Sequence, residues 1–456
     1  MIEASIFRAY DIRGIVGQTL TEDTVYLIGK ALGSLVQDEG GRQLMIARDG
    51  RLSGPTLAVA LSNGILSTGC DVIDIGMAPT PLLYYAVHVG EEHSGVMLTG
   101  SHNPSDYNGL KMVVNGVTLA EEQIQRLYQR ILAKRFHEGQ GKRYECDMME
   151  TYIQHITQTV PLARPLKIVI DAGNGVTGMI APTLFRALGC DVQELFCHVD
   201  GRFPNHHPDP GHPDNLQDLI RVVQEKEAEV GLAFDGDGDR LGVVTRLGEI
   251  IYPDRLLMLF AQSVLTHQPR AKIIYDVKCT NLLGTLIRSL EGEPIMWKTG
   301  HSLIKAKMAE TKAQLAGEMS GHFFFKDRWN GFDDALYAGA RLLEILSQHE
   351  DSVSIFASIP NSVSTSELKV AVTEEEKFPL MQQLKNKAHF TDAKELMTID
   401  GLRVNFAEGW GLVRPSNTTP YLILRFEALN ETMLKKIQFL FREWMLSVKP
   451  DLVLPF

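Results

Sequence analysis

The strongest constraint on the fold of this chain is a pattern that it repeats three times. Short apolar runs typical of strands alternate with helical periodicity, and the last run of each repeat leads into a polar, glycine-rich loop. The loops are residues 100–104, 235–240 and 317–322. Strands that alternate with helices predict α/β units with mainly parallel sheets, in which ligands gather beyond the carboxyl ends of the strands. We therefore predict the α/β fold class, with functional residues on these loops.

From about residue 364 the pattern changes. Strand-like runs at 367–372, 396–406 and 421–426 are interleaved with helical periodicity at 374–387, and an amphipathic helix is predicted at 431–446. This stretch predicts a separate α+β domain with one polar loop, residues 414–420. We expect three similar α/β domains with mixed, mainly parallel sheets and a C-terminal α+β domain, at residues 1–150, 151–252, 253–363 and 364–456.

Composition narrows the class of protein. The formal net charge of -11 argues against nucleic acid as a partner, which requires a basic face. The five cysteines contain no CxxC pair, so a disulfide framework or a zinc knuckle is not expected. The N-terminus lacks the basic and apolar regions of a signal peptide, and no apolar stretch is long enough to cross a bilayer. We expect a cytoplasmic protein without a membrane partner.

The loop at 235–240 alternates three acidic residues, Asp235, Asp237 and Asp239, with Gly236 and Gly238. This spacing lets the backbone fold tightly around one hard cation, and carboxylate oxygens suit Mg²⁺ or Ca²⁺. An EF-hand is excluded because its glycine and glutamate positions are occupied here by arginines. The competing interpretation is a solvated acidic turn, which the mutual repulsion of the carboxylates disfavours. The loop predicts a metal site.

Ser101 lies on a loop that follows a strand of small and apolar residues. Gly100 allows a close backbone approach, and Pro104 prevents the strand from continuing. A serine exposed on such a turn serves as a nucleophile or a phosphate carrier, or it caps backbone amides in an ordinary turn. The loop is not a GxSxG elbow, so an α/β-hydrolase has no support. These residues alone do not decide between the two interpretations.

The loop at 414–420 combines a guanidinium with hydroxyls and an amide, which matches the geometry of phosphate oxygens. A polar hairpin loop is the alternative. The loop at 317–322 could recognise sugar hydroxyls, or it is also a turn. Further cationic or donor side chains are candidates, although each of them alone is more typical of a surface residue. They are Tyr10, Arg13, Lys111, Arg240, Lys278 and His301.

Residues 173–178 fit the GxGxxG pattern of dinucleotide-binding folds, and Glu194 follows at a suitable distance. This segment is the best case for a different class of enzyme, an oxidoreductase. The pattern is short and matches by chance, and no other feature of the sequence indicates hydride chemistry. The glycines can equally serve tight packing of a strand against a helix. No Walker A pattern supports a P-loop nucleotidase.

Four motifs taken together resemble the α-D-phosphohexomutase superfamily. They are Thr-Gly-Ser-His-Asn-Pro at 99–104, Asp-Gly-Asp-Gly-Asp-Arg at 235–240, Gly-Glu-Met-Ser-Gly-His at 317–322 and Arg-Pro-Ser-Asn-Thr-Thr-Pro at 414–420. They occur in this order over nearly the whole chain, one in each predicted domain. The third and fourth motifs, and the opening residues 7–14, look like the bacterial phosphomannomutase/phosphoglucomutase subgroup. The resemblance implies three similar α/β domains and a smaller fourth domain, in a heart shape around one cleft.

The resemblance also implies a mechanism. Ser101 would carry a phosphate and, with the three aspartates, hold one Mg²⁺. Phosphate would move between the 1- and 6-positions of mannose or glucose phosphates through a hexose 1,6-bisphosphate, which is both intermediate and activator. Lys111 and His301 are the implied acid and base, and Arg13 assists catalysis. The implied substrate-binding residues are Tyr10, Arg240, Lys278, Glu318, Ser320, His322, Arg414, Ser416, Asn417 and Thr418.

Several alternatives stay open at this stage. They include a phosphoglucosamine mutase, although this chain lacks the motifs usual in that subgroup. A phosphatase, in which water intercepts the phosphoserine, and a non-catalytic phosphosugar-binding protein are the others. The expected partners are small hexose phosphates, and the expected state is a monomer. The sequence does not rank mannose against glucose, and it does not say which residue is the acid and which the base.

Overall fold

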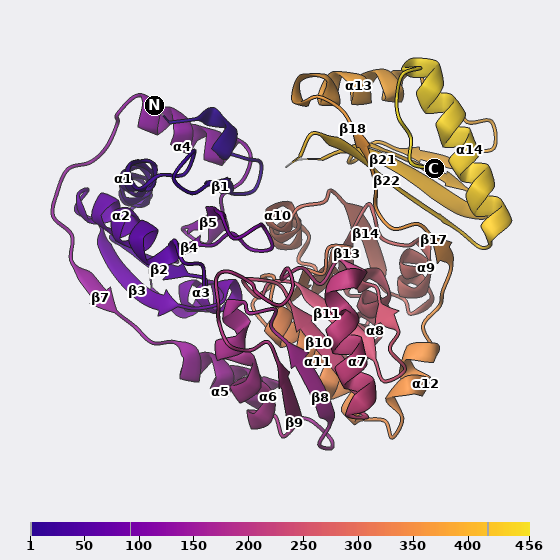
Figure 1. The fold of residues 1–456 in the computed structure, drawn as a ribbon, viewed down its shortest axis with the longest axis horizontal. Coiled ribbons are helices and arrows are strands. Elements are labelled where there is room, and N and C mark those ends of the chain that lie inside the picture. Colours follow the sequence, from indigo (N-terminus) through magenta and orange to yellow (C-terminus); the bar gives the residue numbers. More distant parts are fainter. Residues whose placement is uncertain (1, 92, 417–418) are drawn as a thin grey trace.

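Four β-sheets follow one another along the chain in the computed structural model, which describes residues 2–91, 93–416 and 419–456. We call the elements around them the first to fourth units (Figure 1). Each of the first three units combines a mixed sheet with helices, and the fourth unit has an antiparallel sheet. The predicted α/β fold class with a C-terminal α+β unit is thus confirmed. The exact residue limits of the domains stay predictions.

The first unit contains β1 (Ile12–Ile15), α1 (Glu22–Asp38), β2 (Gln43–Arg48), α2 (Gly54–Leu66), β3 (Asp71–Met77), α3 (Thr80–Val89), β4 (Gly95–Leu98), β5 (Tyr107–Val114), β6 (Val117–Thr118), α4 (Glu122–Leu132) and β7 (Arg143–Glu145). The second contains α5 (Met149–Thr159), β8 (Lys167–Asp171), α6 (Ala181–Ala187), β9 (Asp191–Leu195), α7 (Gln217–Glu225), β10 (Val230–Phe234), β11 (Leu241–Thr245) and β12 (Ile250–Ile251).

The third unit contains α8 (Pro253–His267), β13 (Lys272–Asp276), α9 (Asn281–Ser289), β14 (Glu293–Trp297), α10 (His301–Thr311), β15 (Leu315–Gly317), β16 (Phe323–Phe325), α11 (Ala335–Ser347) and α12 (Ser352–Ala357). The fourth contains β17 (Val363–Ser364), β18 (Leu368–Ala371), α13 (Glu374–Asn386), β19 (Glu395–Met397), β20 (Leu402–Phe406), β21 (Gly409–Pro415), β22 (Tyr421–Ala428) and α14 (Glu431–Val448). None of the helices in the described part of the chain combines the length and the hydropathy that a bilayer span requires.

The first three sheets share one strand order. It reads β3-β2-β4-β5 in the first, β9-β8-β10-β11 in the second and β14-β13-β15-β16 in the third. In each order, the third strand is parallel to the second and antiparallel to the fourth. The three predicted loops therefore connect equivalent pairs of strands, at the carboxyl ends of β4, β10 and β15. Topology alone places them at the same edge of each sheet.

Two of the differences between the secondary structure and the sequence prediction have a clear physical reason. The run at 396–406 forms two strands, β19 and β20, because a turn intervenes in which Gly401 has φ +79°. The antiparallel strand β5 was not predicted, since Asn108 and Lys111 interrupt its apolar pattern although both side chains are buried. Polar residues buried in a strand remove the alternation that sequence patterns rely on.

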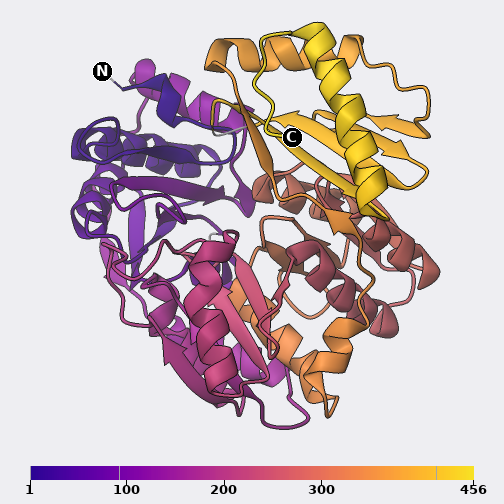
Figure 2. The same ribbon diagram turned by 45° about the vertical axis from the view of Figure 1, so that its right-hand side comes forward.

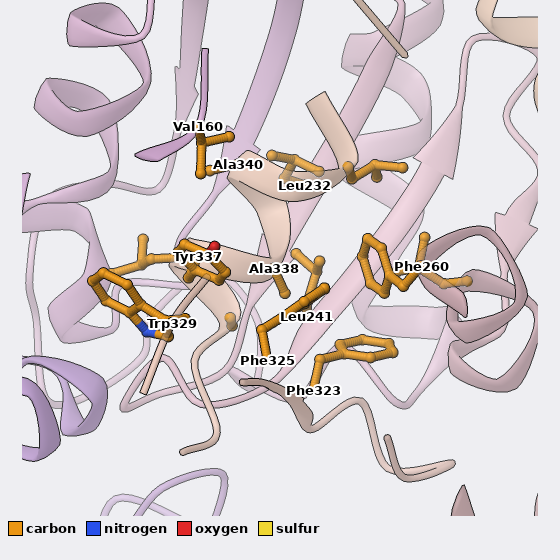
Figure 3. Packing of buried hydrophobic residues seen from close by; sticks show 14 of the residues in the cluster. Val160, Leu232, Leu241, Phe260, Phe323, Phe325, Trp329, Tyr337, Ala338 and Ala340 are labelled. Carbon is orange, nitrogen blue, oxygen red and sulfur yellow. The ribbon is translucent and has the colours of Figure 1, made fainter. Parts of the chain in front are cut away.

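One apolar core extends through the first three units. Helix α11 begins at its N-cap Asp334, whose carboxylate accepts the amide of Tyr337, and nearly all of its residues are buried. Figure 3 shows Ala338 of this helix among Leu241 of β11 and Phe323 of β16. The shared core fixes the sheets of these units relative to one another. Figures 1 and 2 show the fourth unit beside the third and far from the second.

We expect Phe260→Ala to weaken this core. The ring of Phe260 is fully buried and packs edge-on against Phe323 and Phe325 at centroid distances of 5.1 and 5.0 Å. Removing such a ring costs about 3–5 kcal/mol because a cavity remains. Phe439→Ala on α14 is the control, since that ring is 59% exposed and its loss should cost less than about 0.5 kcal/mol. Urea midpoints that shift equally in both variants would contradict the assignment.

Candidate active site

Ser101 and the aspartate loop meet, although they come from different units. The Ser101 hydroxyl donates a hydrogen bond of 2.9 Å to Oδ2 of Asp235. Ser101 is 2% exposed and has φ +48°, in the left-handed region that a non-glycine residue seldom adopts. Gly236 permits this approach, because a Cβ on it would lie 2.3 Å from the carbonyl oxygen of Ser101. The serine therefore faces the acidic cluster.

The aspartate loop folds around the carboxylate of Asp235. Its Oδ1 accepts hydrogen bonds of 3.0 to 3.1 Å from the backbone amides of Gly238, Asp239 and Arg240. Gly238 makes the turn possible with φ +80°. The carboxylates of Asp235, Asp237 and Asp239 are completely buried, and they offer oxygens that all lie within 4.8 Å of one another. This is the arrangement that the alternating glycines predict.

Lys111 on β5 neutralises part of this charge. Its ammonium donates to Oδ2 of Asp237 at 2.7 Å and also pairs with Asp239. Burial opposes the charged form of Lys111, but these carboxylates hold its pKa above the ordinary value. Burial and the carboxylates of Asp239 and Asp237 hold the pKa of Asp235 well above its ordinary value. Three buried carboxylates thus share one nearby ammonium.

The acidic cluster fits a divalent cation. Oδ1 of Asp237 and Oδ1 of Asp239 are buried and accept no hydrogen bond. Buried oxygens without a donor cost free energy, and a hard cation with oxygen ligands would remove that cost. The cluster can therefore hold one metal ion, with the three aspartates as its protein ligands.

Two arginines hold the serine loop in place by donating hydrogen bonds to its backbone carbonyls. Arg13 on β1 donates to the carbonyl of Gly100 at 2.8 Å and to the side chain of Asn103. Arg51, which is 1% exposed, donates to the carbonyls of Ser101 and Asn103 at 2.8 and 2.6 Å. Sequence reasoning proposed Arg13 but not Arg51. The signal that could have found Arg51 is its position in a polar run directly after a strand.

Asp49 supplies the acceptor on the other side of the serine loop. Its Oδ2 accepts from the hydroxyl of Thr99 at 2.8 Å, from the amide of Gly100 at 3.1 Å and from Nε of Arg51 at 3.2 Å. Asp49 is 1% exposed, so these bonds form away from water. The pair of Asp49 and Arg51 thus fixes the strained backbone of Ser101.

The loop at 317–322 reaches the aspartates from the third unit. Nε2 of His322 lies 3.4 Å from Oδ1 of Asp239, and its Nδ1 is 2.9 Å from the Ser320 hydroxyl. Although burial opposes it, the carboxylates of Asp239 and Glu318 raise the pKa of His322 to about 9. Nε of Arg240 lies 3.4 Å from the same histidine. Arg240, Ser320 and His322 are thereby brought together.

His301 and Tyr10 lie next to this loop. His301 is the first residue of α10, and its ring stacks on that of His322 at a centroid distance of 5.8 Å. The Tyr10 ring approaches His301 edge-on at 6.2 Å, and its hydroxyl donates to the carbonyl of Thr299 at 2.8 Å. Glu318 accepts the amide of Gly300 at 2.6 Å, which ties the two loops of the third unit together.

The fourth unit meets the third through Asp400, which sequence reasoning missed. Oδ2 of Asp400 accepts from Nε of Arg414 at 2.9 Å and from the amide of Thr299 at 3.1 Å. Asp400 thereby links Arg414 to Thr299, whose carbonyl accepts the hydrogen bond from Tyr10. The hydroxyl of Ser416 accepts the amide of Thr419 at 3.1 Å.

Two of the predicted phosphate ligands, Asn417 and Thr418, lie outside the described residues. Lys278 of the third unit pairs with Glu367 at 2.6 Å and lies 3.9 Å from Asp276. Burial opposes the charged form of Lys278, but Glu367 and Asp276 hold its pKa above the ordinary value. Lys278 therefore presents a fixed positive charge where the third and fourth units meet.

The glycine pattern at 173–178 serves packing. A Cβ on Gly175 would lie 3.0 Å from Cα of Gly236, and one on Gly178 would lie 2.1 Å from the carbonyl oxygen of Cys197. Residues 176–179, which overlap the end of the pattern, form a short 3-10 turn rather than a helix that could bind a pyrophosphate at its N-terminus. These glycines let the aspartate loop approach its own sheet closely.

Comparison with known proteins places the whole chain in one family. The sequence matches the four domains described for phosphoglucomutase/phosphomannomutase. Alpha/beta/alpha domains I, II and III match residues 4–138, 150–248 and 252–362, and the C-terminal domain matches residues 367–442.

Curated relatives and solved structures agree with this match. The chain is 56% identical to a phosphomannomutase/phosphoglucomutase of Pseudomonas putida, over 99% of the chain and 98% of that protein. It is 52% identical to a phosphoglucomutase of Neisseria meningitidis, over 100% and 99%. A crystal structure of a phosphoglucomutase/phosphomannomutase family protein from Burkholderia thailandensis superposes with a TM-score of 0.96, at 54% identity over 100% of both chains. Because these matches cover all four units, the chain belongs to the phosphoglucomutase/phosphomannomutase family of α-D-phosphohexomutases.

Proposed function

We propose that the chain transfers phosphate reversibly between the 1- and 6-positions of hexose phosphates, of mannose, glucose or both. The observation that carries this proposal is the 2.9 Å contact between the Ser101 hydroxyl and Asp235. It brings the proposed phosphate carrier and the proposed metal-binding cluster to one point. The relatives named phosphomannomutase/phosphoglucomutase, at 56% identity over nearly the full chain, support the same activity.

Mg²⁺ is the proposed metal, because Asp235, Asp237 and Asp239 present only oxygens. An oxygen of phosphorylated Ser101 would complete the ligand set. When bound, the ion would withdraw charge from the phosphoryl group during its transfer. Arg13 and the pair of Asp49 and Arg51 keep the serine loop in place while the phosphoryl group moves.

Transfer begins with a substrate whose phosphate binds at Arg414 and Ser416, together with Asn417 and Thr418. The free hydroxyl of the sugar attacks the phosphorus on Ser101, so the new O–P bond forms as the P–Oγ bond breaks. A hexose 1,6-bisphosphate results. It then turns within the site and returns its other phosphate to Ser101, which regenerates the phosphoenzyme and releases the isomer.

The sugar would be held by groups that tolerate both orientations. Glu318 and Ser320 would bind ring hydroxyls. His322 of the same loop contacts the Ser320 hydroxyl and lies 3.4 Å from Asp239. The phosphates would be bound, and the ring positioned, by the cationic side chains of Lys278 and Arg240 and by the hydroxyl of Tyr10. Ring hydroxyls are the part of the sugar that keeps similar positions after a half-turn.

His301 is the better candidate for the base that removes the hydroxyl proton. The ammonium of Lys111 is held by two carboxylates, so it is suited to donate rather than accept. Burial and the ammonium groups of Lys305 and Lys111 hold the pKa of His301 well below its ordinary value, which keeps the imidazole neutral. A neutral imidazole can accept the proton and later return it.

We expect Ser101→Ala to lower mutase turnover by roughly 10³-fold or more, because the variant lacks the hydroxyl that would carry the phosphate. Glucose 1-phosphate, mannose 1-phosphate and glucosamine 1-phosphate should be assayed side by side with Mg²⁺ and a trace of glucose 1,6-bisphosphate. Intact-protein mass should show one phosphoryl group on the wild type and none on this variant. Ser105→Ala, on the exposed part of the same loop, is the control and should retain activity. Full activity of Ser101→Ala, or release of inorganic phosphate without isomerised sugar, would refute the proposal.

The metal site predicts opposite effects of a chelator and Mg²⁺ on a Lys111 variant. Lys111→Met leaves buried carboxylates unpaired, and such a loss typically costs about 3–5 kcal/mol. The thermal midpoint of Lys111→Met should therefore fall in EDTA, and Mg²⁺ should raise it by more than it raises that of the wild type. The added change Asp237→Asn should reduce the Mg²⁺ effect.

Lys436→Met is the matched control for this experiment. Its pair with Asp392 is 52% and 63% exposed, so the loss should stay below about 1 kcal/mol and should not respond to Mg²⁺. Identical Mg²⁺ shifts in the wild type and the Lys111 variant, or none in either, would count against the aspartates as the metal site.

A further inference from the structure

A threonine of the first unit contacts the aspartate loop twice. Thr80 is the first residue of α3, and it is fully buried. Its hydroxyl donates a hydrogen bond of 2.6 Å to Oδ2 of Asp237, and its amide donates one of 2.8 Å to the backbone carbonyl of the same residue. One residue of the first unit thus holds both the side chain and the backbone of an aspartate in the second.

The two oxygens of the Asp237 carboxylate have opposite surroundings. Oδ2 accepts from the Thr80 hydroxyl and from the Lys111 ammonium at 2.7 Å, whereas Oδ1 is buried and has no donor among the described residues. Each carboxylate oxygen has about two acceptor sites, so the two donors occupy those of Oδ2. Buried acceptors without a partner are rare in folded proteins. Oδ1 is therefore the oxygen of Asp237 that is available to a cation.

The other two aspartates of the loop divide their oxygens in a similar way. Asp235 uses Oδ1 for three backbone amides of its own loop and leaves Oδ2 for Ser101, while Asp239 uses Oδ2 for the ammonium of Lys111. The ammonium is shared between Asp237 and Asp239, and it lies at the end of a flexible stem that does not by itself fix either carboxylate. A second donor on Oδ2 of Asp237 limits that carboxylate to one orientation.

The Thr80 hydroxyl belongs to a rigid part of the first unit. Pro79 precedes it as the N-cap of α3, Pro81 follows it, and Leu82 lies in the apolar core that the first three units share. Helix α3 is therefore fixed relative to the aspartate loop. Because a β-branched side chain on a fixed backbone has few rotamers, the hydroxyl has little freedom to leave Asp237.

The third unit holds the next residue of the loop. The amide of Ala335, the first residue of α11, donates a hydrogen bond of 3.2 Å to the carbonyl of Gly238. The backbone around Asp237 is thus held from both neighbouring units, which leaves the rotation of its carboxylate as the remaining freedom. The Thr80 hydroxyl and the Lys111 ammonium limit that rotation.

We propose that Thr80 is a positioning residue of the metal site, which turns the carboxylate of Asp237 so that Oδ1 faces the cation. This inference rests on the proposed function, in which Asp235, Asp237 and Asp239 hold Mg²⁺. A partner that orients a metal-binding side chain raises the affinity for the metal, because less conformational freedom is lost when the ion binds. The competing interpretation is a hydrogen bond that joins the first two units and has no effect on the metal.

Thr80→Val tests the proposal, because valine keeps the shape of the side chain and lacks the hydroxyl. We expect the Kd for Mn²⁺, measured from the electron paramagnetic resonance of the free ion and by competition with Mg²⁺, to rise about tenfold or more. Thr80→Ser and Thr80→Ala form a second pair that differs only in the hydroxyl, and the Kd of Thr80→Ala should be higher by a similar factor. Equal Kd values within either pair would overturn the proposal.

Thr177→Val is the matched control at the same loop. The Thr177 hydroxyl is buried without a hydrogen-bond partner among the described residues, and its methyl group would lie 2.4 Å from a Cβ on Gly238. This change removes a hydroxyl beside the loop but no donor to a carboxylate, so the Kd for Mn²⁺ should stay within about twofold of that of the wild type. A Kd that rises equally in Thr80→Val and Thr177→Val would attribute the effect to packing and refute the positioning role.

Urea unfolding in EDTA and in saturating Mg²⁺ separates the two interpretations without any turnover. A cation that binds the folded protein stabilises it more when its Kd is lower, so a tenfold rise in Kd removes about 1.4 kcal/mol of the Mg²⁺ effect. Thr80→Val should therefore lose more stability in Mg²⁺ than in EDTA, relative to the wild type. An equal loss under both conditions would establish a hydrogen bond that only joins the units.

The measurements also separate this inference from the function on which it rests. A wild type that binds neither Mn²⁺ nor Mg²⁺ would remove the metal site of the proposed function. A wild type that binds one ion, with the same Kd as Thr80→Val, would refute the role of Thr80 and leave the proposed function in place.

Discussion

The three carboxylates of the aspartate loop are buried close together, where the first three units meet. Asp235, Asp237 and Asp239 repel one another and are screened from water, so they require positive charge and donors nearby. The second unit supplies the backbone amides that bind Asp235, but the ammonium comes from Lys111 in the first unit, and His322 approaches from the third. No single unit could hold this loop in its observed form. The charge of the buried aspartates therefore requires contacts with side chains of the first and third units.

The repeated strand order explains why these units can cooperate. In each of the first three sheets the loop between a parallel strand and its antiparallel neighbour carries the reactive side chains. The same short connection thus presents a serine in one unit, carboxylates in the next and sugar-binding candidates in the third. Because the apolar core around α11 joins the three units, the loops keep fixed mutual positions. Loops at equivalent backbone positions therefore carry different functional groups.

The sequence predicts site residues that belong to short motifs and misses contacts between residues that lie far apart in the chain. Ser101 and the three aspartates belong to short motifs, so their residue types and spacing are enough to identify them. Arg51 holds the serine loop across 50 residues of sequence, and Lys111 meets Asp237 across 126. No spacing rule relates such pairs, and Asp400 was missed for the same reason. The shared strand order was also missed, because it depends on the pairing of β4 with β5, whose buried lysine hides its strand pattern.

The fourth unit is attached by a different kind of contact. Its apolar core is separate from the one that joins the first three units. A small apolar cluster joins Val277 of the third unit to Trp410 and Leu412 of the fourth. The other contacts between the two units include polar pairs, such as Lys278 with Glu367 and Thr280 with Glu427. Such contacts depend on exact partners, whereas apolar packing depends mainly on area. The position of Arg414 relative to Ser101 therefore depends on this small cluster and a few polar pairs, while the larger shared core sets that of the aspartates. A substrate phosphate bound at Arg414 would add one more charged partner to that interface.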